Sequence, residues 1–202
     1  MSKSSLWIVD KEYKGSEIFY YQNSWLLTPV AGQILFEKYL PEKVITSYGK
    51  MSFLAIVGSG NGAFNELNKR INESAVLEDR IIWELIMQQT FRIQDKGVVS
   101  SALKNFLTIN NYSENGEAEH IVKRFEEVAG NIEQLDVDNV QFFIFKNTST
   151  DDGVESIFQK FDENLEEYVS LKFNEIEEFY SEIVIIEEGK ISGFVKNNEY
   201  FN

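Results

Sequence analysis

Cysteine is absent from this chain, and histidine occurs once, at His120. Without cysteine the chain forms no disulfide and no thiolate metal site, so a reducing compartment is the simpler environment for it. A single histidine excludes histidine-pair metal sites and longer histidine proton relays within one chain. No serine nucleophile or acidic partner matches His120 by spacing, so a histidine-based triad is not indicated either.

Long hydrophobic runs are also lacking. The longest uninterrupted apolar runs are about five residues, whereas a membrane-spanning helix needs roughly 20. The first residues, MSKSSLWIVDKEYKG, contain no apolar segment typical of a signal peptide. We therefore expect a soluble, cytoplasmic protein. With 202 residues, of which 43% are hydrophobic and 14% aromatic, the chain is long and apolar enough to bury a core.

Positive charge is scarce and is never concentrated. No basic cluster exceeds the pairs Lys69-Arg70 and Lys123-Arg124, so direct binding of DNA or RNA is not predicted. The net charge is −14, and it is unevenly distributed. Residues 1–113 carry 12 basic and 11 acidic residues, a net of +1, whereas residues 114–202 carry 7 and 22, a net of −15. An acidic region of this kind attracts basic partners; the alternative is that it only keeps an aromatic-rich protein soluble.

The hydrophobic pattern predicts an α+β fold. Strand-like runs occur near both ends of the chain, and the clearest is a hairpin of Ser181–Ile186 and Lys190–Val195 around Glu187-Glu188-Gly189. Between them the apolar spacing predicts about four central helices, including Leu77–Ile93 and Glu117–Leu135. We expect the terminal strands to form one mixed or antiparallel sheet packed on these helices, in a single domain of residues 1–202 with a subdomain boundary near 110–116.

The sharpest motif is the glycine loop from Gly58 to Gly62. Ser52–Val57 reads as a strand and Ala63–Asn72 as a helix, and a strand, a glycine loop and a helix in that order can hold a phosphate on backbone N–H groups. Gly58, Gly60 and Gly62 are therefore the candidate residues of a nucleotide site. The motif lacks the second parallel strand of a dinucleotide fold and the Lys-Ser/Thr pair of a P-loop, so a plain strand-to-helix turn is the stronger reading.

Two clusters of aspartates could bind a hard cation. They are Asp136-Val137-Asp138 and Asp151-Asp152-Gly153, and neither has the spacing of a calcium-binding EF-hand loop. The same residues serve well as turn-forming polar groups. We predict no catalytic residue, no metal and no cofactor.

The most informative stretch is the acidic run that begins at Asp162. Six aromatic residues are interleaved with its carboxylates and with Glu175, Glu177 and Glu178: Phe158, Phe161, Tyr168, Phe173, Phe179 and Tyr180. A surface that grips a basic protein uses this combination, because aromatics supply buried area and acids supply steering. The alternative is that the aromatics face the core. The predicted partner-binding residues are Asp162, Glu163, Glu166, Glu167, Tyr168, Glu175, Glu177 and Glu178.

These observations favour a binding protein over an enzyme. The first hypothesis is an acidic inhibitor of a basic partner: an immunity protein or antitoxin against a nuclease-like toxin, or a phage counter-defence protein that mimics nucleic acid. The second is a nucleotide-binding enzyme or sensor that uses Gly58–Gly62. The third is a structural or oligomer-forming domain. The frequent Ile, Asn, Lys, Phe, Tyr and Glu suit an AT-rich bacterial or phage genome.

Overall fold

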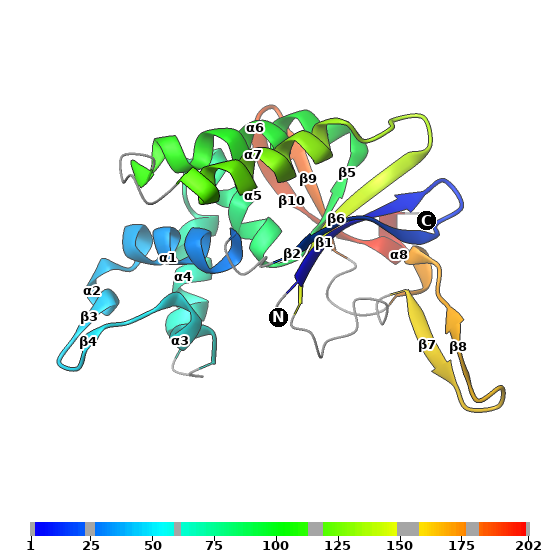
Figure 1. Cartoon of the computed structure of the whole chain (residues 1–202), viewed down its shortest axis with the longest axis horizontal. Coiled ribbons are helices and arrows are strands. Elements are labelled where there is room, and N and C mark those ends of the chain that lie inside the picture. Colours follow the sequence, from blue (N-terminus) through cyan, green and yellow to red (C-terminus); the bar gives the residue numbers. More distant parts are fainter. Residues whose placement is uncertain are drawn as a thin grey trace.

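The chain folds as an α+β protein in the computed structural model shown in Figure 1, which describes residues 3–22, 27–58, 62–112, 119–148, 158–176 and 182–200. The strands of its main sheet are β1 (Lys3–Asp10), β2 (Gly15–Gln22), β5 (Thr90–Arg92), β6 (Val140–Thr148), β9 (Glu182–Glu187) and β10 (Lys190–Lys196). They lie in the order β10-β9-β5-β6-β1-β2. The predicted fold class is confirmed, because strands from both ends of the chain share one sheet.

Helices fill the interval between the terminal strands. They are α1 (Leu27–Tyr39), α2 (Pro41–Val44), α3 (Phe53–Gly58), α4 (Ala63–Asn72), α5 (Leu77–Ile86), α6 (Lys96–Ile109), α7 (Glu119–Glu133) and the terminal α8 (Asn197–Tyr200). In Figure 1, α5, α6 and α7 lie above the sheet, and α1 to α4 lie to one side. Within the described ranges, no helix has the length and apolarity needed to cross a lipid bilayer.

Two small hairpins stand outside the main sheet. One is formed by β3 (Ile45–Thr46) and β4 (Gly49–Lys50), and the other by β7 (Gln159–Asp162) and β8 (Glu167–Ser170). Figure 1 shows them pointing away from opposite sides of the molecule.

The two halves of the sheet meet through the short strand β5. It pairs antiparallel with β6 and parallel with β9, so it joins the N-terminal strands to the C-terminal ones. The predicted β9–β10 hairpin is present, and its turn uses positive φ angles of 49° at Glu188 and 72° at Gly189. That turn chemistry matches the right-handed twist of paired strands.

The sheet is buried on both faces. In β6, Phe143 and Phe145 belong to the core that packs against the helices, while Phe142 and Ile144 face a second apolar cluster on the opposite side. This alternation follows from the two-residue period of a strand. Phe158 and Phe173, from the chain on either side of the β7–β8 hairpin, belong to the second cluster.

The helix predicted over Leu77–Ile93 is shorter than expected. It is buried on more than one side as predicted, but it ends at Ile86, and Gln88 turns the chain with a φ of 61°. Thr90–Arg92 then forms β5. The apolar spacing continues past the turn, but β5 gains hydrogen-bonded partners on both sides, and this tertiary pairing outweighs local periodicity.

The strand predicted over Ser52–Val57 is wrong, because Phe53–Gly58 is the helix α3. Phe53 and Ile56 are buried and Leu54 and Val57 are 58% and 52% exposed, which is helical rather than alternating burial. The N–H of Phe53 donates to Gln33 Oε1 at 2.7 Å, which ties the start of this helix to α1. A short continuous apolar run does not distinguish the two structures by itself.

Candidate functional site

The structure brings five of the predicted partner-binding residues together on one hairpin. Asp162 ends β7, Glu163 and Glu166 lie in the turn, and Glu167 and Tyr168 begin β8. We call residues 159–170 the acidic hairpin.

The remaining predicted residues divide into two groups. Glu175 lies beyond the acidic hairpin, in the short 3-10 helix Phe173–Glu175, where its carboxylate accepts the backbone N–H of Lys172 at 2.9 Å. The Glu175 carboxylate is therefore used in a hydrogen bond at the base of the hairpin. Glu177 and Glu178 lie outside the described residues.

Buried aromatic residues fix the base of the acidic hairpin. Phe158 stacks on Trp7 of β1 with ring centroids 5.1 Å apart and an interplanar angle of 16°. The same ring lies so close to Gly15 that a methyl group there would be 2.3 Å from it, so only glycine allows this approach. After the second strand of the hairpin, Phe173 is fully buried, and its ring centroid lies 5.4 Å from that of Phe142.

A buried asparagine adds a polar anchor at the same base. Asn197, only 1% exposed, donates from Nδ2 to the carbonyl oxygen of Phe173 and, at 2.8 Å, to that of Ile176. Aromatic packing and these two hydrogen bonds therefore anchor the hairpin, and the buried side-chain amide of Asn197 has acceptors for its N–H groups.

The far end of the acidic hairpin contains two features that lower its stability. Asp162 lies directly opposite Glu167 in the register, a like-charge pair that weakens strand pairing. Asp162 Oδ1 accepts the N–H of Asn164 at 2.9 Å, which forms the turn. Glu166 closes it with a φ of 53°, a left-handed conformation that favours glycine or asparagine. Both features lower the stability of the hairpin, so contacts elsewhere must hold it in place.

Large apolar side chains on the acidic hairpin face solvent. Phe161 and Tyr168 are cross-strand partners with ring centroids 5.4 Å apart, and they are 51% and 68% exposed. Leu165, at the turn, is 60% exposed. Phe161 was among the interleaved aromatics but not among the predicted partner-binding residues, and Leu165 was missed. A leucine inside the run DENLEE, where polar residues would suffice, was a usable signal.

The aromatics around the acidic run therefore divide between the two readings. Phe158 and Phe173 face the core, as in the alternative reading, whereas Phe161 and Tyr168 face solvent. Phe179 and Tyr180 lie outside the described residues.

The acidic hairpin holds four carboxylates and one cation, Lys160, so its charge is balanced only in part. Within the described part of the chain, none of Asp162, Glu163, Glu166 and Glu167 forms an ion pair. The acidic face of α7 differs, because three of its four glutamates pair with a neighbouring cation. These pairs are Glu119 with Lys123, Glu127 with Arg124 and Glu133 with Lys104. The hairpin thus carries the more strongly uncompensated negative field of the two.

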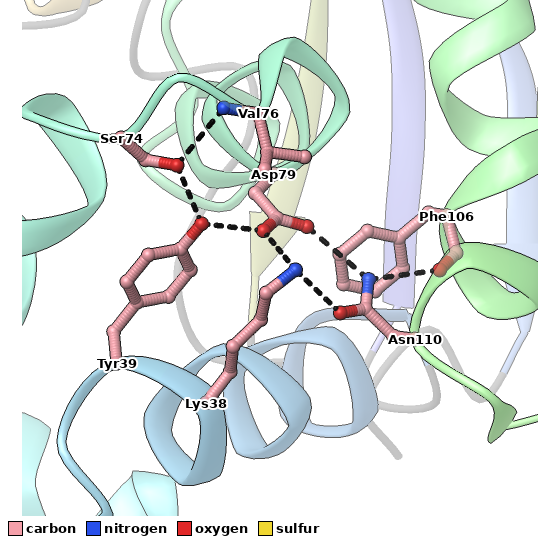
Figure 2. A network of polar contacts seen from close by, with 7 residues as sticks. All are labelled: Lys38, Tyr39, Ser74, Val76, Asp79, Phe106 and Asn110. Atoms are coloured by element: carbon pink, nitrogen blue, oxygen red, sulfur yellow. Dashed lines mark hydrogen bonds and ion pairs between the residues drawn. The ribbon is translucent and has the colours of Figure 1, made fainter.

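A second concentration of polar groups joins three helices, as Figure 2 shows. Asp79 of α5 is fully buried, and its Oδ2 lies 2.6 Å from both Lys38 Nζ and the Tyr39 hydroxyl of α1. Asn110, at the end of α6, donates to Asp79 Oδ1 at 3.2 Å and accepts from Lys38 Nζ at 2.9 Å. Ser74 completes the cluster by contacting the Tyr39 hydroxyl at 2.6 Å.

The polar groups of this network mostly satisfy one another. Lys38 and Asn110 also line a cavity of about 480 Å³ between α1 and the end of α6. In Figure 2, however, Lys38 Nζ is directed to Asp79 and Asn110. We interpret the network as a clamp between helices, since a buried carboxylate must be paired and hydrogen-bonded to be tolerated.

The glycine loop has a different context from the predicted one. Gly58 ends helix α3, Gly62 precedes α4 with a φ of 77°, and Gly60 lies outside the described residues. The strand on which the phosphate-binding order depended is a helix. Neither Gly58 nor Gly62 lines any of the cavities described here.

The Asp136 turn and the histidine have ordinary surroundings, and Asp151-Asp152-Gly153 lies outside the described residues. Asp136 accepts the N–H of Asp138 at 2.9 Å and the side-chain amide of Asn139 at 2.6 Å, and these bonds lower the pKa of its carboxyl. His120 is exposed on α7. Among the described residues, no group of three or more His, Asp or Glu side chains is placed to hold a metal ion.

The acidic hairpin is the one predicted site whose residues the structure gathers, with a fixed base, an exposed apolar pair and four unpaired carboxylates in the described part of the chain. The chain matches no protein-family model, no curated protein and no solved structure.

Proposed function

We propose that this protein binds a basic partner protein through the acidic hairpin and inhibits it without catalysis. A single observation carries the proposal: one hairpin with a buried base holds two exposed aromatic rings, an exposed leucine and four carboxylates that form no ion pair within the described residues. Carboxylates that serve only solubility need no such apolar neighbours.

The two kinds of side chain have separate tasks. Phe161, Leu165 and Tyr168 supply the apolar area that a partner buries, which is where most binding free energy arises. The carboxylates accelerate encounter with a positive surface and reject acidic or neutral ones. Because the base of the hairpin is already packed, association costs less conformational entropy than folding a free loop.

Inhibition follows from where the carboxylates dock. A nuclease or another nucleic-acid-binding protein holds phosphates on a positive surface, and a hairpin with carboxylates can occupy that surface in their place. An immunity protein or antitoxin and a phage counter-defence protein are two settings of this same chemistry. Both act in the cytoplasm, which is consistent with a chain that contains no cysteine.

The test begins by isolating the partner from the cells that express the protein, with a photo-crosslinker at Leu165 and a control crosslinker at Val137, which is similarly exposed at 54%. Association with the purified partner is then timed at about 50 mM and about 500 mM salt. We expect association to slow by about tenfold or more at the higher salt, because steering is screened.

A pair of charge-matched variants locates the effect. The first neutralises the hairpin with Asp162→Asn, Glu163→Gln, Glu166→Gln and Glu167→Gln. The second neutralises the outer face of α7 with Glu119→Gln, Glu126→Gln, Glu127→Gln and Glu133→Gln, so both lose the same total charge. We expect association to slow by about tenfold or more in the first variant and by less than about threefold in the second. Equal slowing would make net charge, not the hairpin, responsible and would refute the proposal.

A further inference from the structure

A cavity of about 380 Å³ lies where the base of the acidic hairpin meets the main sheet. Residues 14–17, at the start of β2, contribute one part of its lining, and residues 158–159 and 170–172, at the base of the hairpin, contribute another. None of the carboxylates of the acidic hairpin lines it. The volume is at the lower end of the range for small-molecule sites, which is about 300–1,000 Å³, so the cavity suits a small ligand.

One wall of the cavity is made of two stacked rings. Trp7 and Phe158 are 7% and 4% exposed, and both line the cavity. The one polar atom of the indole is already used, because Trp7 Nε1 donates to Ser5 Oγ at 2.9 Å. Trp7 therefore offers only carbon atoms to a ligand, and the half-buried Leu171 adds to this apolar part of the lining. An apolar ring or a short chain would be covered here.

Two lysines are held opposite each other at the same cavity. Lys14 and Lys172 form an isolated antiparallel bridge, and both line the cavity. The backbone fixes this arrangement, since the N–H of Phe173 donates to the carbonyl oxygen of Tyr13 at 2.8 Å. Like charges directly opposite each other destabilise a strand pair, and an anion between them would offset that repulsion.

The charge of the lining favours an anion over a cation. Lys14 also contacts Glu12 at 2.7 Å, whereas Lys172 forms no ion pair within the described ranges. Glu17 is the one acid in the lining, so two lysines and one glutamate give the cavity a net charge of +1, against −14 for the whole chain. Positive charge is thus in local excess at a point of an otherwise acidic molecule.

The lining also holds uncharged hydrogen-bond donors. They are the hydroxyl groups of Ser16 and Ser170 and the side-chain amide of Gln159. Gln159 and Ser170 are register partners at the base of the hairpin, so these two residues lie side by side. An ionised carboxylate accepts several hydrogen bonds, and uncharged donors near the two lysines can fill the acceptor positions that the ammonium groups leave open.

We infer that this cavity binds a small organic acid, whose apolar body packs against the stacked rings while its carboxylate lies between Lys14 and Lys172. The inference goes beyond the proposed function and does not depend on it, because neither the carboxylates of the acidic hairpin nor a protein partner takes part. The two sites share only the base of the hairpin, which lines the cavity. A bound acid would therefore tie the hairpin to the main sheet.

Three ligands that share one body test the inference on the full-length protein. They are 3-phenylpropionate, 3-phenylpropanamide and 3-phenylpropylammonium, which near neutral pH are an anion, a neutral amide and a cation. Changes in the backbone amide NMR signals give the dissociation constants and locate the site. We expect the acid to bind with a dissociation constant on the order of 1 mM, the amide to bind about fivefold more weakly and the ammonium about tenfold more weakly. Signals of residues 14–17 and 170–172 should shift most.

Single substitutions separate recognition of the anion from packing on the apolar wall. Lys172→Gln should weaken binding of the acid about fivefold and binding of the amide by less than about twofold, because only the acid depends on the ammonium group. Glu17→Gln should strengthen binding of the acid about twofold, since it removes the one acid of the lining. Lys190→Gln is the matched control. Lys190 is exposed at the start of β10, and its loss changes the total charge equally but should alter acid binding by less than about twofold.

Other outcomes overturn the inference. Equal binding of acid and amide would leave an apolar cavity that does not recognise an anion, and tightest binding of the ammonium would show that the negative field of the molecule prevails. Equal weakening by Lys172→Gln and Lys190→Gln would assign the effect to net charge. No binding of the acid at about 20 mM, or signal changes confined to other regions, would reject the site. The proposed function is untouched by these results, because the crosslinker and the charge-matched variants test it at other residues.

Discussion

At the scale of single residues, Glu84 is the most unfavourably placed ionisable group that the structure describes. It lies on α5, is 3% exposed, and its Oε1 has no hydrogen-bond partner in the described structure. Burial raises the pKa of its carboxyl to about 8, the charge of Arg80 lowers it in part, and the charge of Glu182 raises it further. At neutral pH the side chain is therefore mostly protonated and neutral, as expected for an acid without a partner in an apolar interior.

This pKa makes stability depend on pH. Between an unfolded-state value near 4.5 and the folded-state value of about 8, the folded protein holds the proton and the unfolded chain releases it. The free energy of unfolding therefore falls as pH rises through this window, by up to about 1.4 kcal/mol per pH unit from this group. Glu84→Gln should remove that slope in urea unfolding at about pH 5.5, 6.5 and 7.5. Parallel curves for the two proteins would contradict the assignment.

Asp79 gives a second residue-level prediction. Asp79→Asn removes the carboxylate that accepts from Tyr39 and Lys38, so the free energy of unfolding should fall by about 3 kcal/mol. Glu37→Gln is the control, because it breaks an exposed ion pair with Lys50 and should cost only about 0.5 kcal/mol. Both values come from urea unfolding. Similar losses in the two variants would mean that the network is no clamp.

At the scale of elements, the acidic hairpin combines residues that destabilise its turn with large side chains that face solvent. Its like-charge pair and its left-handed Glu166 both oppose hairpin formation, yet the buried Phe158 and Phe173 hold its two ends in place. Anchoring from outside the hairpin explains how such a turn is maintained. A single substitution that relieves one of these costs should therefore raise the stability of the hairpin.

Glu166→Gly tests this balance. Glycine adopts a φ of 53° without the penalty of a Cβ atom, so local stability of the hairpin should rise by about 1 kcal/mol. Slower amide exchange in β7 and β8 would report the gain. Asn164→Gly is the control, since its φ is not positive and glycine there only adds freedom to the unfolded chain. Faster exchange in Glu166→Gly would show that the glutamate side chain itself stabilises the turn.

Elements also mark where sequence reasoning fails. The periodicity of Leu77–Ile86 predicts α5 correctly, but the same spacing continues into Thr90–Arg92, which is a strand. The apolar run at Phe53 has the composition of a strand and is a helix. In both cases the deciding contacts come from distant segments: β6 and β9 for the first, and Gln33 of α1 for the second.

At the scale of the whole molecule, the net charge of −14 affects folding stability and association in opposite ways as salt is added. Self-repulsion opposes the compact state, and salt screens it. In the proposed function the same charges attract a basic partner, so salt should weaken that association. Folding and binding should therefore respond to ionic strength with opposite signs.

We expect the free energy of unfolding in urea to rise by about 1 kcal/mol between about 50 mM and about 500 mM salt. The hairpin variant with four neutralised carboxylates should show a smaller increase, because it removes four of the 14 excess charges. A fall in stability with salt would instead assign the larger role to ion pairs such as those of Arg70 with Glu42 and Glu66.

The sequence by itself determined the fold class, the β9–β10 hairpin, the helices Ala63–Asn72 and Glu119–Glu133, and the acidic run at Asp162, because each depends on local periodicity, turn chemistry or composition. The prediction of a subdomain boundary near 110–116 stays a prediction. Only the tertiary structure decided that Thr90–Arg92 joins the two halves of the sheet, and that Phe158 and Phe173 are buried while Phe161 and Tyr168 face solvent. Burial and strand pairing depend on residues far apart in the chain, and local patterns carry no information about which of them meet.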